Sequence, residues 1–187
     1  APADGTTVGF SPEALAMLKA RWANVRLLET RDIRHTGHRK INYKSIPGGM
    51  LVQERDMKLA NVNDWIHAAG PRPDEPTLRD AAFAWAAAKH LKSNAVAIAA
   101  DGQLMGAGMG QVDRVNACRL AIERAGARMK SAKSPVAASD AFFPFPDGRK
   151  LLIDAGVKCI VHPGGSKRDH ETLDLCDSRG VTCMITS

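Results

Sequence analysis

The sequence predicts an α/β fold with three α/β/α layers, in which one sheet carries helices on both faces. Two observations favour it. In the second half of the chain, short apolar runs alternate with segments whose apolar residues recur at helical spacing. One run, AVAIAA at 95–100, is apolar throughout, as expected for a strand buried on both faces. With 187 residues, 44% of them hydrophobic and 25% charged, we expect a single domain over 1–187.

The first third of the chain contains a clear helix start and two strand-like runs. The tripeptide SPE at 11–13 supplies a cap, a proline at the first helical position and an acidic residue near the positive helix end. VRLLE at 25–29 and GGMLVQE at 48–54 predict strands. The segment 30–47 is rich in Arg, His and Lys, and predicts an exposed loop or edge.

After the break PRPDEP at 71–76, helices and strands alternate to the end. Thr77 or Asp74 caps a helix over 77–91, and the turn Asp101-Gly102 joins the strand 95–100 to a second hairpin arm. The later elements are helices over 112–125, 148–155 and 166–179, the last with Gly180 as its C′ residue, and strands over 136–139, 157–161 and 181–186.

Composition narrows the class of protein. A net charge of +6 favours anionic partners, or serves only solubility. No apolar run is long enough to span a membrane, and APADGTTVGF lacks the features of a signal peptide. The sequence also begins without an initiator Met, as expected of a processed chain or of a piece of a longer protein. The four cysteines are irregularly spaced without CxxC, which favours reduced, buried thiols and a cytoplasmic protein.

Three loops occupy positions at strand ends, where ligands of open α/β sheets collect. They are KSN at 92–94, SDAFFPFPDG at 139–148 and HPGGSKRD at 162–169. The second, which we call the Phe loop, holds three of the five phenylalanines between two aspartates. In the third, Ser166 and Asp169 predict a helix start whose free N–H groups bind an anion or a polar ring edge. The alternative is a simple, well-capped turn.

Other sites are disfavoured by spacing. GAGMGQVDR at 106–114 lacks the dinucleotide-binding spacing. Cys159 and His162 form a lone CxxH, and the chain has neither HxE nor PCxxC, so we expect no zinc. No local signature supports a serine or cysteine nucleophile.

Four motifs in order, KSNA, DGQLMGAGMGQVDRV, ASDAFFPFPDG and HPGGSKRD, resemble AICAR transformylase. This is the formyltransferase portion of the bifunctional AICAR transformylase/IMP cyclohydrolase family. The resemblance runs from about Phe10 to the C-terminus and includes SPEAL and GGMLVQERD. It implies the second of two related cytidine-deaminase-like domains without zinc. The family transfers a formyl group from 10-formyltetrahydrofolate to the 5-amino group of AICAR.

The resemblance also implies residue roles. Asn94 matches an asparagine near the transferring formyl group, and Arg114 matches an arginine that binds and polarises at the reaction centre. Asp140 resembles a residue associated with a structural potassium ion in some members. The folate-binding residues implied are Phe142, Pro144, Phe145, Asp147 and Ser166.

The Phe loop suits such a ligand physically. A flat heteroaromatic ring needs apolar faces and a carboxylate at its donor edge, and FFPFPD supplies both. The alternative is that the phenylalanines anchor the loop to the core while the aspartates cap turns.

The chain departs from the family pattern in several places. The catalytic Lys-His pair belongs to the first transformylase domain, which is missing here, as is the cyclohydrolase domain. Lys89-His90 precedes KSNA at a helix end, and we interpret it as structural. Asp113 stands where a serine usually precedes Arg114, and should add negative charge near the reacting centre. The chain stops at Ser187, before the Arg-rich tail of the family.

These departures leave several functions open. The first is the folate side of the formyltransferase, with a homodimer or a sister transformylase domain completing the site. The others are a non-catalytic folate-binding or scaffold module, and a fragment of the full enzyme. Nucleic-acid binding is disfavoured because aromatic and basic residues are not interleaved. We expect the isolated chain to bind folate without turnover.

Overall fold

The computed structural model describes residues 9–29, 41–58 and 60–186. The chain divides into two compact units, residues 1–57 and residues 58–187, which are described separately below as unit 1 and unit 2.

Unit 1 contains the predicted first helix, α1 (Pro12–Arg21). The Oγ atom of Ser11 accepts a hydrogen bond from the Ala14 N–H at 3.2 Å, which confirms the predicted cap. The strand predicted at 25–29 is wrong, because these residues form no strand. A strand needs a partner for its backbone groups, and here the Val25 N–H instead closes a turn on the Trp22 carbonyl at 3.3 Å.

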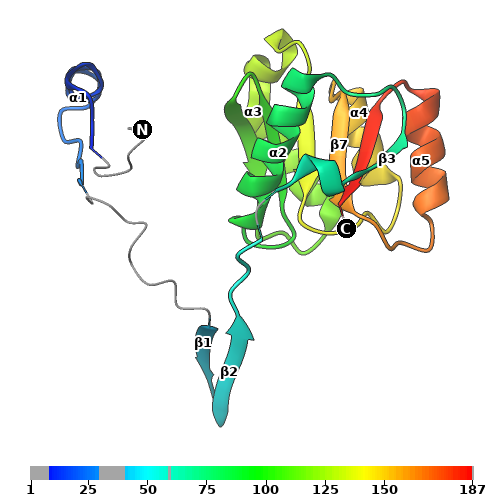
Figure 1. Cartoon of the computed structure of the whole chain (residues 1–187), viewed down its shortest axis with the longest axis horizontal. Helices are drawn as coiled ribbons and strands as arrows, with labels where there is room; N and C mark the ends of the chain where they lie inside the picture. The colour runs from blue at the N-terminus through cyan, green and yellow to red at the C-terminus, as the bar shows by residue number, and fades with distance from the viewer. Residues whose placement is uncertain (1–8, 30–40, 59, 187) are drawn as a thin grey trace. The chain divides into compact units, whose positions relative to one another are not determined.

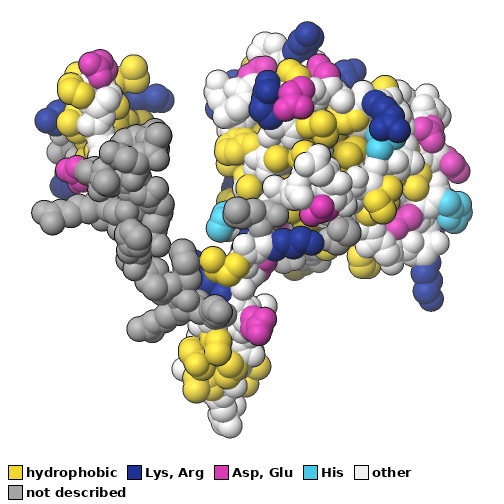
Figure 2. Space-filling view, viewed as in Figure 1, with side chains coloured by type: hydrophobic (Ala, Val, Ile, Leu, Met, Phe, Trp, Pro, Cys, Tyr) yellow, Lys and Arg dark blue, Asp and Glu magenta, His cyan; other side chains and the backbone are white. Residues whose placement is uncertain are grey.

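Strands β1 (Ile41–Ile46) and β2 (Gly49–Glu54) form an antiparallel hairpin. The strand predicted at 48–54 is confirmed, and β1 lies within the stretch predicted as an exposed loop or edge. Residues 30–40 of that stretch are outside the described part of the chain. Gly48 has a φ of 79°, which suits the tight turn between the strands. Every residue of both strands is exposed, and apolar side chains gather on the hairpin surface (Figure 2).

Unit 2 is built on a six-stranded mixed sheet of order β3-β8-β7-β6-β4-β5 (Figure 1). The three strands β6, β7 and β8 are parallel, and the pairs outside them are antiparallel. The strand bounds are β3 (Ile66–Ala69), β4 (Val96–Ala100), β5 (Gln103–Gly108), β6 (Val136–Ser139), β7 (Cys159–Pro163) and β8 (Thr182–Thr186). The edge strand β3, which follows the short 3-10 helix η1 (Val62–Asp64), had no prediction from the sequence.

Helices cover both faces of this sheet, which confirms the predicted three-layer α/β/α architecture. Helix α2 (Glu75–Lys89) packs on one face. Helices α3 (Arg114–Ser131), α4 (Asp147–Asp154) and α5 (Asp169–Ser178) pack on the other. Strand β4 shows the alternation: Ile98 points toward α3–α5, and Ala97 and Ala99 point toward α2.

Helix boundaries follow the caps. Asp74 caps α2, because its Oδ1 atom accepts from the Thr77 N–H at 3.0 Å. Helix α3 starts at Arg114 rather than near 112, because Asp113 is its N-cap. It also continues past the predicted end to Ser131, across a non-helical Gly126.

Two features bear on the class of protein. All four cysteines are free and buried, as predicted. Among the described residues, none of the helices is both long and apolar enough to cross a bilayer.

Candidate functional site

A pocket of about 420 Å³ opens in unit 2, where the loop before β4, the start of α3 and the Phe loop meet. This volume lies in the range usual for small-molecule sites. Its lining residues are Asn94, Val112, Asp113, Arg114, Val115, Ala141, Phe142, Pro144, Phe145 and Gly148. The structure therefore brings together Asn94, Arg114, Phe142, Pro144 and Phe145 of the predicted site. Asp147 and Ser166 are outside the lining.

The three phenylalanines of the Phe loop divide between two roles. Phe143 is 1% exposed and packs edge-on against His162 with ring centroids 5.6 Å apart. Phe142 and Phe145 are 42% and 54% exposed and line the pocket. The core-anchor interpretation therefore holds for Phe143. The other two rings leave apolar surface in water, which is the arrangement expected of a binding loop.

Arg114 is fixed in the pocket wall by an ion pair. Its Nη1 atom donates to the Asp140 carboxylate and, at 3.0 Å, to the Ala95 carbonyl. Its Nε atom is buried without a hydrogen-bond partner. A guanidinium group that is held rigidly in a pocket wall suits the stabilisation of an oxygen that gains negative charge.

Asp140 is committed to this arrangement. Burial acts to raise the pKa of Asp140, but hydrogen bonds from the Ser93 side chain and the Ala95 N–H, together with Arg114, hold it below its usual value. The Ala95 N–H donates at 2.8 Å to the same oxygen, Oδ1, that Arg114 contacts. The Oδ1 atom of Asp140 is therefore already occupied by two donors, and the predicted potassium ion remains a prediction.

Asn94 and Asp113 are each held by short hydrogen bonds. Asn94 Nδ2 donates to the Gln111 carbonyl at 2.9 Å, which leaves the side-chain oxygen to face a ligand. Both oxygens of Asp113 accept from Asn116, from its backbone N–H and from its Nδ2 atom, each at 2.7 Å. Because Ser and Asp are both good N-caps, Asp113 keeps the cap, and its charge is directed at the helix start.

The third loop differs from its prediction. The Oδ2 atom of Asp169 accepts from the N–H groups of Gly165 and Ser166 at 2.9 and 3.0 Å. The predicted helix start at Ser166 is therefore wrong. Asp169 ties these residues into a turn, and α5 begins at Asp169 itself. These hydrogen bonds occupy two of the N–H groups that were predicted to be free to bind an anion.

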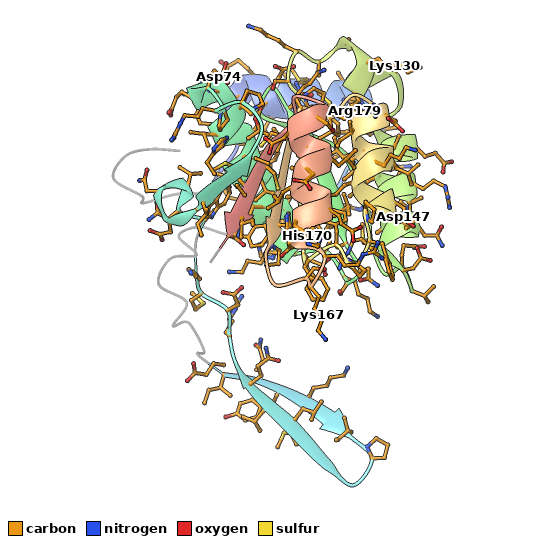
Figure 3. The ribbon with its side chains drawn as sticks, turned by 90° about the vertical axis from the view of Figure 1, so that its right-hand side faces the viewer. Asp74, Lys130, Asp147, Lys167, His170 and Arg179 are labelled. Atoms are coloured by element: carbon orange, nitrogen blue, oxygen red, sulfur yellow. The ribbon has the colours of Figure 1, made fainter. Side chains whose placement is uncertain are left out.

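Arg168 connects this loop with the Phe loop. Its guanidinium carbon lies 5.4 Å from the centre of the Phe145 ring. Hydrogen bonds to Glu171 raise the pKa of Arg168, and the nearby charge of Asp147 adds to this effect. Asp147, at the start of α4, and His170, in the first turn of α5, lie toward the same end of unit 2 (Figure 3). Asp147 follows Phe145 by two residues and is close enough to Arg168 to affect its pKa, but it is outside the pocket lining.

A buried polar cluster beneath the two loops was missed by the sequence analysis. Arg149 and His162 are fully buried, and Arg149 Nη2 lies 2.6 Å from His162 Nε2. The available signal was an arginine three residues before Leu152, on the buried face of α4. His162 points away from Cys159, which lies on the α2 face, so the CxxH pair cannot chelate one metal. Among the described residues, no cluster of three or more His, Cys, Asp or Glu side chains could hold a metal ion.

Lys89 and His90 lie at the end of α2, as predicted, and are not part of the pocket lining. The Nζ atom of Lys89 donates to the Lys58 carbonyl at 2.8 Å, which is a structural contact.

The chain resembles known proteins along most of its length. Residues 6–124 match the model of a family described as AICARFT/IMPCHase bienzyme. The chain is 47% identical over 180 residues to the bifunctional purine biosynthesis protein PurH of Mycobacterium ulcerans, and 46% identical over 181 residues to that of Cutibacterium acnes. These matches cover 95% of this chain but 33% and 34% of the relatives. The chain therefore spans about a third of their length.

Two solved structures share part of the architecture at low identity. One is a guanine deaminase from Nitrosomonas europaea, with a TM-score of 0.41, 17% identity, and coverage of 64% of this chain and 81% of the deaminase. The other is a cyanophage dCMP deaminase, with a TM-score of 0.38, 16% identity, and coverage of 60% and 98%.

Proposed function

Because the chain belongs to the AICARFT/IMPCHase bienzyme family, we propose that it supplies the folate side of formyl transfer from 10-formyltetrahydrofolate to the 5-amino group of AICAR. The observation that carries the proposal is the pocket. It places two exposed phenylalanine rings, Phe142 and Phe145, beside Asn94 and Arg114. Flat ring ligands gain affinity from such faces, and polar groups at the edge orient them.

Each side chain then has a definable task. Pro144 and Phe145 pack against the pterin ring, and Asp147 accepts hydrogen bonds from the ring donors. Arg114, fixed by Asp140 in the pocket wall, stabilises the charge of the formyl oxygen during attack by the amine. Asn94 positions the attacking amine through its side-chain oxygen.

The acid–base pair for this reaction is not expected from this chain. Lys89 and His90 are outside the pocket lining, which favours a partner as the source of these groups. That partner is a second copy or a sister transformylase domain. General acid–base catalysis contributes about 10²–10⁴-fold, so the isolated chain should bind folate without measurable turnover. The same observation favours the second candidate function, a folate-binding module without catalysis.

Calorimetry with a stable 5,8-dideaza analogue of 10-formyltetrahydrofolate tests the proposal. Asp147→Asn should weaken binding by about 1–3 kcal/mol, because ring donors are left badly paired. Phe142→Ala should weaken it by about 1 kcal/mol or more. The matched control is Phe83→Ala: Phe83 is also 42% exposed, but it lies on α2, so its loss should leave binding unchanged.

Absence of binding to the wild-type chain would disprove the proposed function. A steady-state assay with AICAR decides between the two candidates. Formyl transfer by the pure chain would contradict the expected need for a partner, and would make Lys89 and His90 candidates for catalysis.

A further inference from the structure

Two loops of the candidate site rest on one buried cluster. The Phe loop runs directly into α4, which carries Arg149 two residues after Asp147. The third loop runs from the end of β7, at His162, to the start of α5, at Asp169. Arg149 is 0% exposed and contacts both ends of the third loop, and is therefore placed between the two loops.

The contacts of Arg149 are specific. Its Nη2 atom donates to His162 Nε2 at 2.6 Å and lies 3.7 Å from Asp169 Oδ1. Its guanidinium carbon lies 5.0 Å from the centre of the Phe143 ring, the anchor of the Phe loop. His162 Nδ1 donates to the Pro163 carbonyl at 2.7 Å, so its Nε2 atom is the acceptor in a neutral ring. Burial, and then the charge of Arg149, lower the pKa of His162 to about 4, consistent with that state.

Asp169 links Arg149 to the backbone of the third loop. One of its oxygens faces Arg149, and the other accepts the N–H groups of Gly165 and Ser166. The position of the third loop therefore depends on where this carboxylate is held. The Asp169 side chain is 20% exposed, but its Oδ1 atom is buried, and a buried carboxylate oxygen stays in place only while a charge or donors compensate its lost hydration.

We propose that Arg149 is a positioning residue that holds the Phe loop and the third loop at a fixed separation. It joins Phe143 beneath one loop to Asp169 beneath the other. The buried Nε and Nη1 atoms of Arg149 and Oδ1 of Asp169 lack hydrogen-bond partners. The charge of Arg149 therefore compensates the buried Oδ1 atom of Asp169. A ligand that contacts both loops needs them at the separation that Arg149 holds.

Residue-resolved amide hydrogen exchange of the full chain tests the ordering role without any ligand. In Arg149→Met, Asp169 loses its compensating charge and turns toward water, so the N–H groups of Gly165 and Ser166 should exchange faster. We expect an increase of about tenfold or more, equivalent to about 1.4 kcal/mol of local stability.

The chain offers a matched control on the same two helices. Arg179 Nη2 contacts Asp154 Oδ1 at 2.6 Å, joining the C-terminal ends of α4 and α5 at an exposed site, where Figure 3 labels Arg179. Arg179→Met removes an ion pair between α4 and α5 but leaves the loop end intact. It should leave exchange of the Gly165 and Ser166 amides unchanged. Equal exchange rates in Arg149→Met and the wild type, or equal acceleration in the two variants, would overturn the proposal.

Should Arg149→Met fail to fold, Arg149→Gln carries the same test. A glutamine amide can still donate to His162 but places no charge opposite Asp169, so the two amides should again exchange faster than in the wild type, and unchanged rates overturn the proposal. The role in ligand binding rests on the proposed function. In calorimetry with the dideaza analogue, Arg149→Met should bind about fivefold more weakly or worse, and Arg179→Met like the wild type. If the wild type does not bind, the proposed function fails, while the exchange result still decides the ordering role.

Discussion

Unit 2 buries apolar side chains on both faces of its sheet, whereas no described residue of unit 1 is buried. Both units nevertheless contain regular structure. In unit 1 it follows from local rules: a serine cap and a proline at the start of α1, and a glycine turn between β1 and β2. In unit 2 the same rules act together with a packed core.

The difference shows that local signals are sufficient to define an element but not to stabilise it. A helix of ten residues is marginal alone in water, and so is a single two-stranded hairpin. Unit 1 should therefore depend on a surface outside itself, while unit 2 should not.

The strongest test of the comparison separates the two units. A fragment of residues 58–187 should unfold cooperatively, with a midpoint close to that of the full chain, because the core lies within it. A fragment of residues 1–57 should show no cooperative transition in circular dichroism. Cooperative unfolding of the shorter fragment by itself would break the comparison.

The same distinction explains how much of the fold the sequence predicts. Strands such as AVAIAA and the capped helices of unit 2 were found because local pattern and core burial agree there. VRLLE at 25–29 has the pattern of a strand but no partner strand, and pattern alone cannot reveal that. Strand β3 was missed for the opposite reason. It is short and lacks a clear alternation, but β8 supplies its hydrogen bonds.

For the site, sequence motifs identified the residues that line the pocket but not those that support it. Asn94, Arg114 and Phe145 belong to the motifs KSNA, DGQLMGAGMGQVDRV and ASDAFFPFPDG, respectively. The Arg149–His162 contact joins residues on separate elements, and only the packing of α4 against β7 brings them together. The turn closed by Asp169 could not be predicted from the sequence either, because the Asp169 side chain competes there with the helix for the same N–H groups.

Buried titratable groups exist only where there is a core, so acid sensitivity should arise in unit 2. The pKa of His162 is lowered to about 4 in the folded chain and is near 6.5 when unfolded. Between these values the unfolded state binds the extra proton, so stability falls as the pH falls from about 6.5 to 4. The loss should reach about 3 kcal/mol at most.

Urea unfolding across this pH range measures the effect. His162→Gln keeps an acceptor for Arg149 but does not titrate, so its stability should change much less between pH 6.5 and 4. The loss of stability from protonated carboxylates is common to both chains and should begin only below about pH 5. An unchanged pH slope in His162→Gln would show that another group is responsible.

A pair of glycine substitutions compares packing in the two units directly. A Cβ atom on Gly108 of β5 would lie 1.9 Å from the Ala117 carbonyl of α3, so the helix must shift. Gly108→Ala should therefore destabilise the chain by about 1–3 kcal/mol in urea unfolding. At Gly49 of β2 a Cβ would meet nothing within 4 Å, and Gly49→Ala should change stability by less than about 0.5 kcal/mol. A similar cost at both positions would contradict the difference in packing.

The last prediction concerns the surface of the β1–β2 hairpin and has the smallest expected effect on folding. It tests which surface covers the exposed apolar residues of unit 1. Tyr43 pairs with Val52 across the strands, and Ile41 and Met50 lie on the same face, two residues away. All four side chains are exposed. We expect a second copy of the chain to cover this face, giving a dimer in light scattering at micromolar concentration.

The double variant Tyr43→Ser and Val52→Thr should weaken that dimer about tenfold or more, since buried aromatic residues dominate interface energies. Unfolding of unit 2 should change by less than about 0.5 kcal/mol, because neither residue belongs to its core. Asn42→Ser with Gln53→Thr alters the cross-strand pair on the opposite face and should leave the dimer intact. A wild-type monomer at these concentrations would rule out a second copy as the cover of this face.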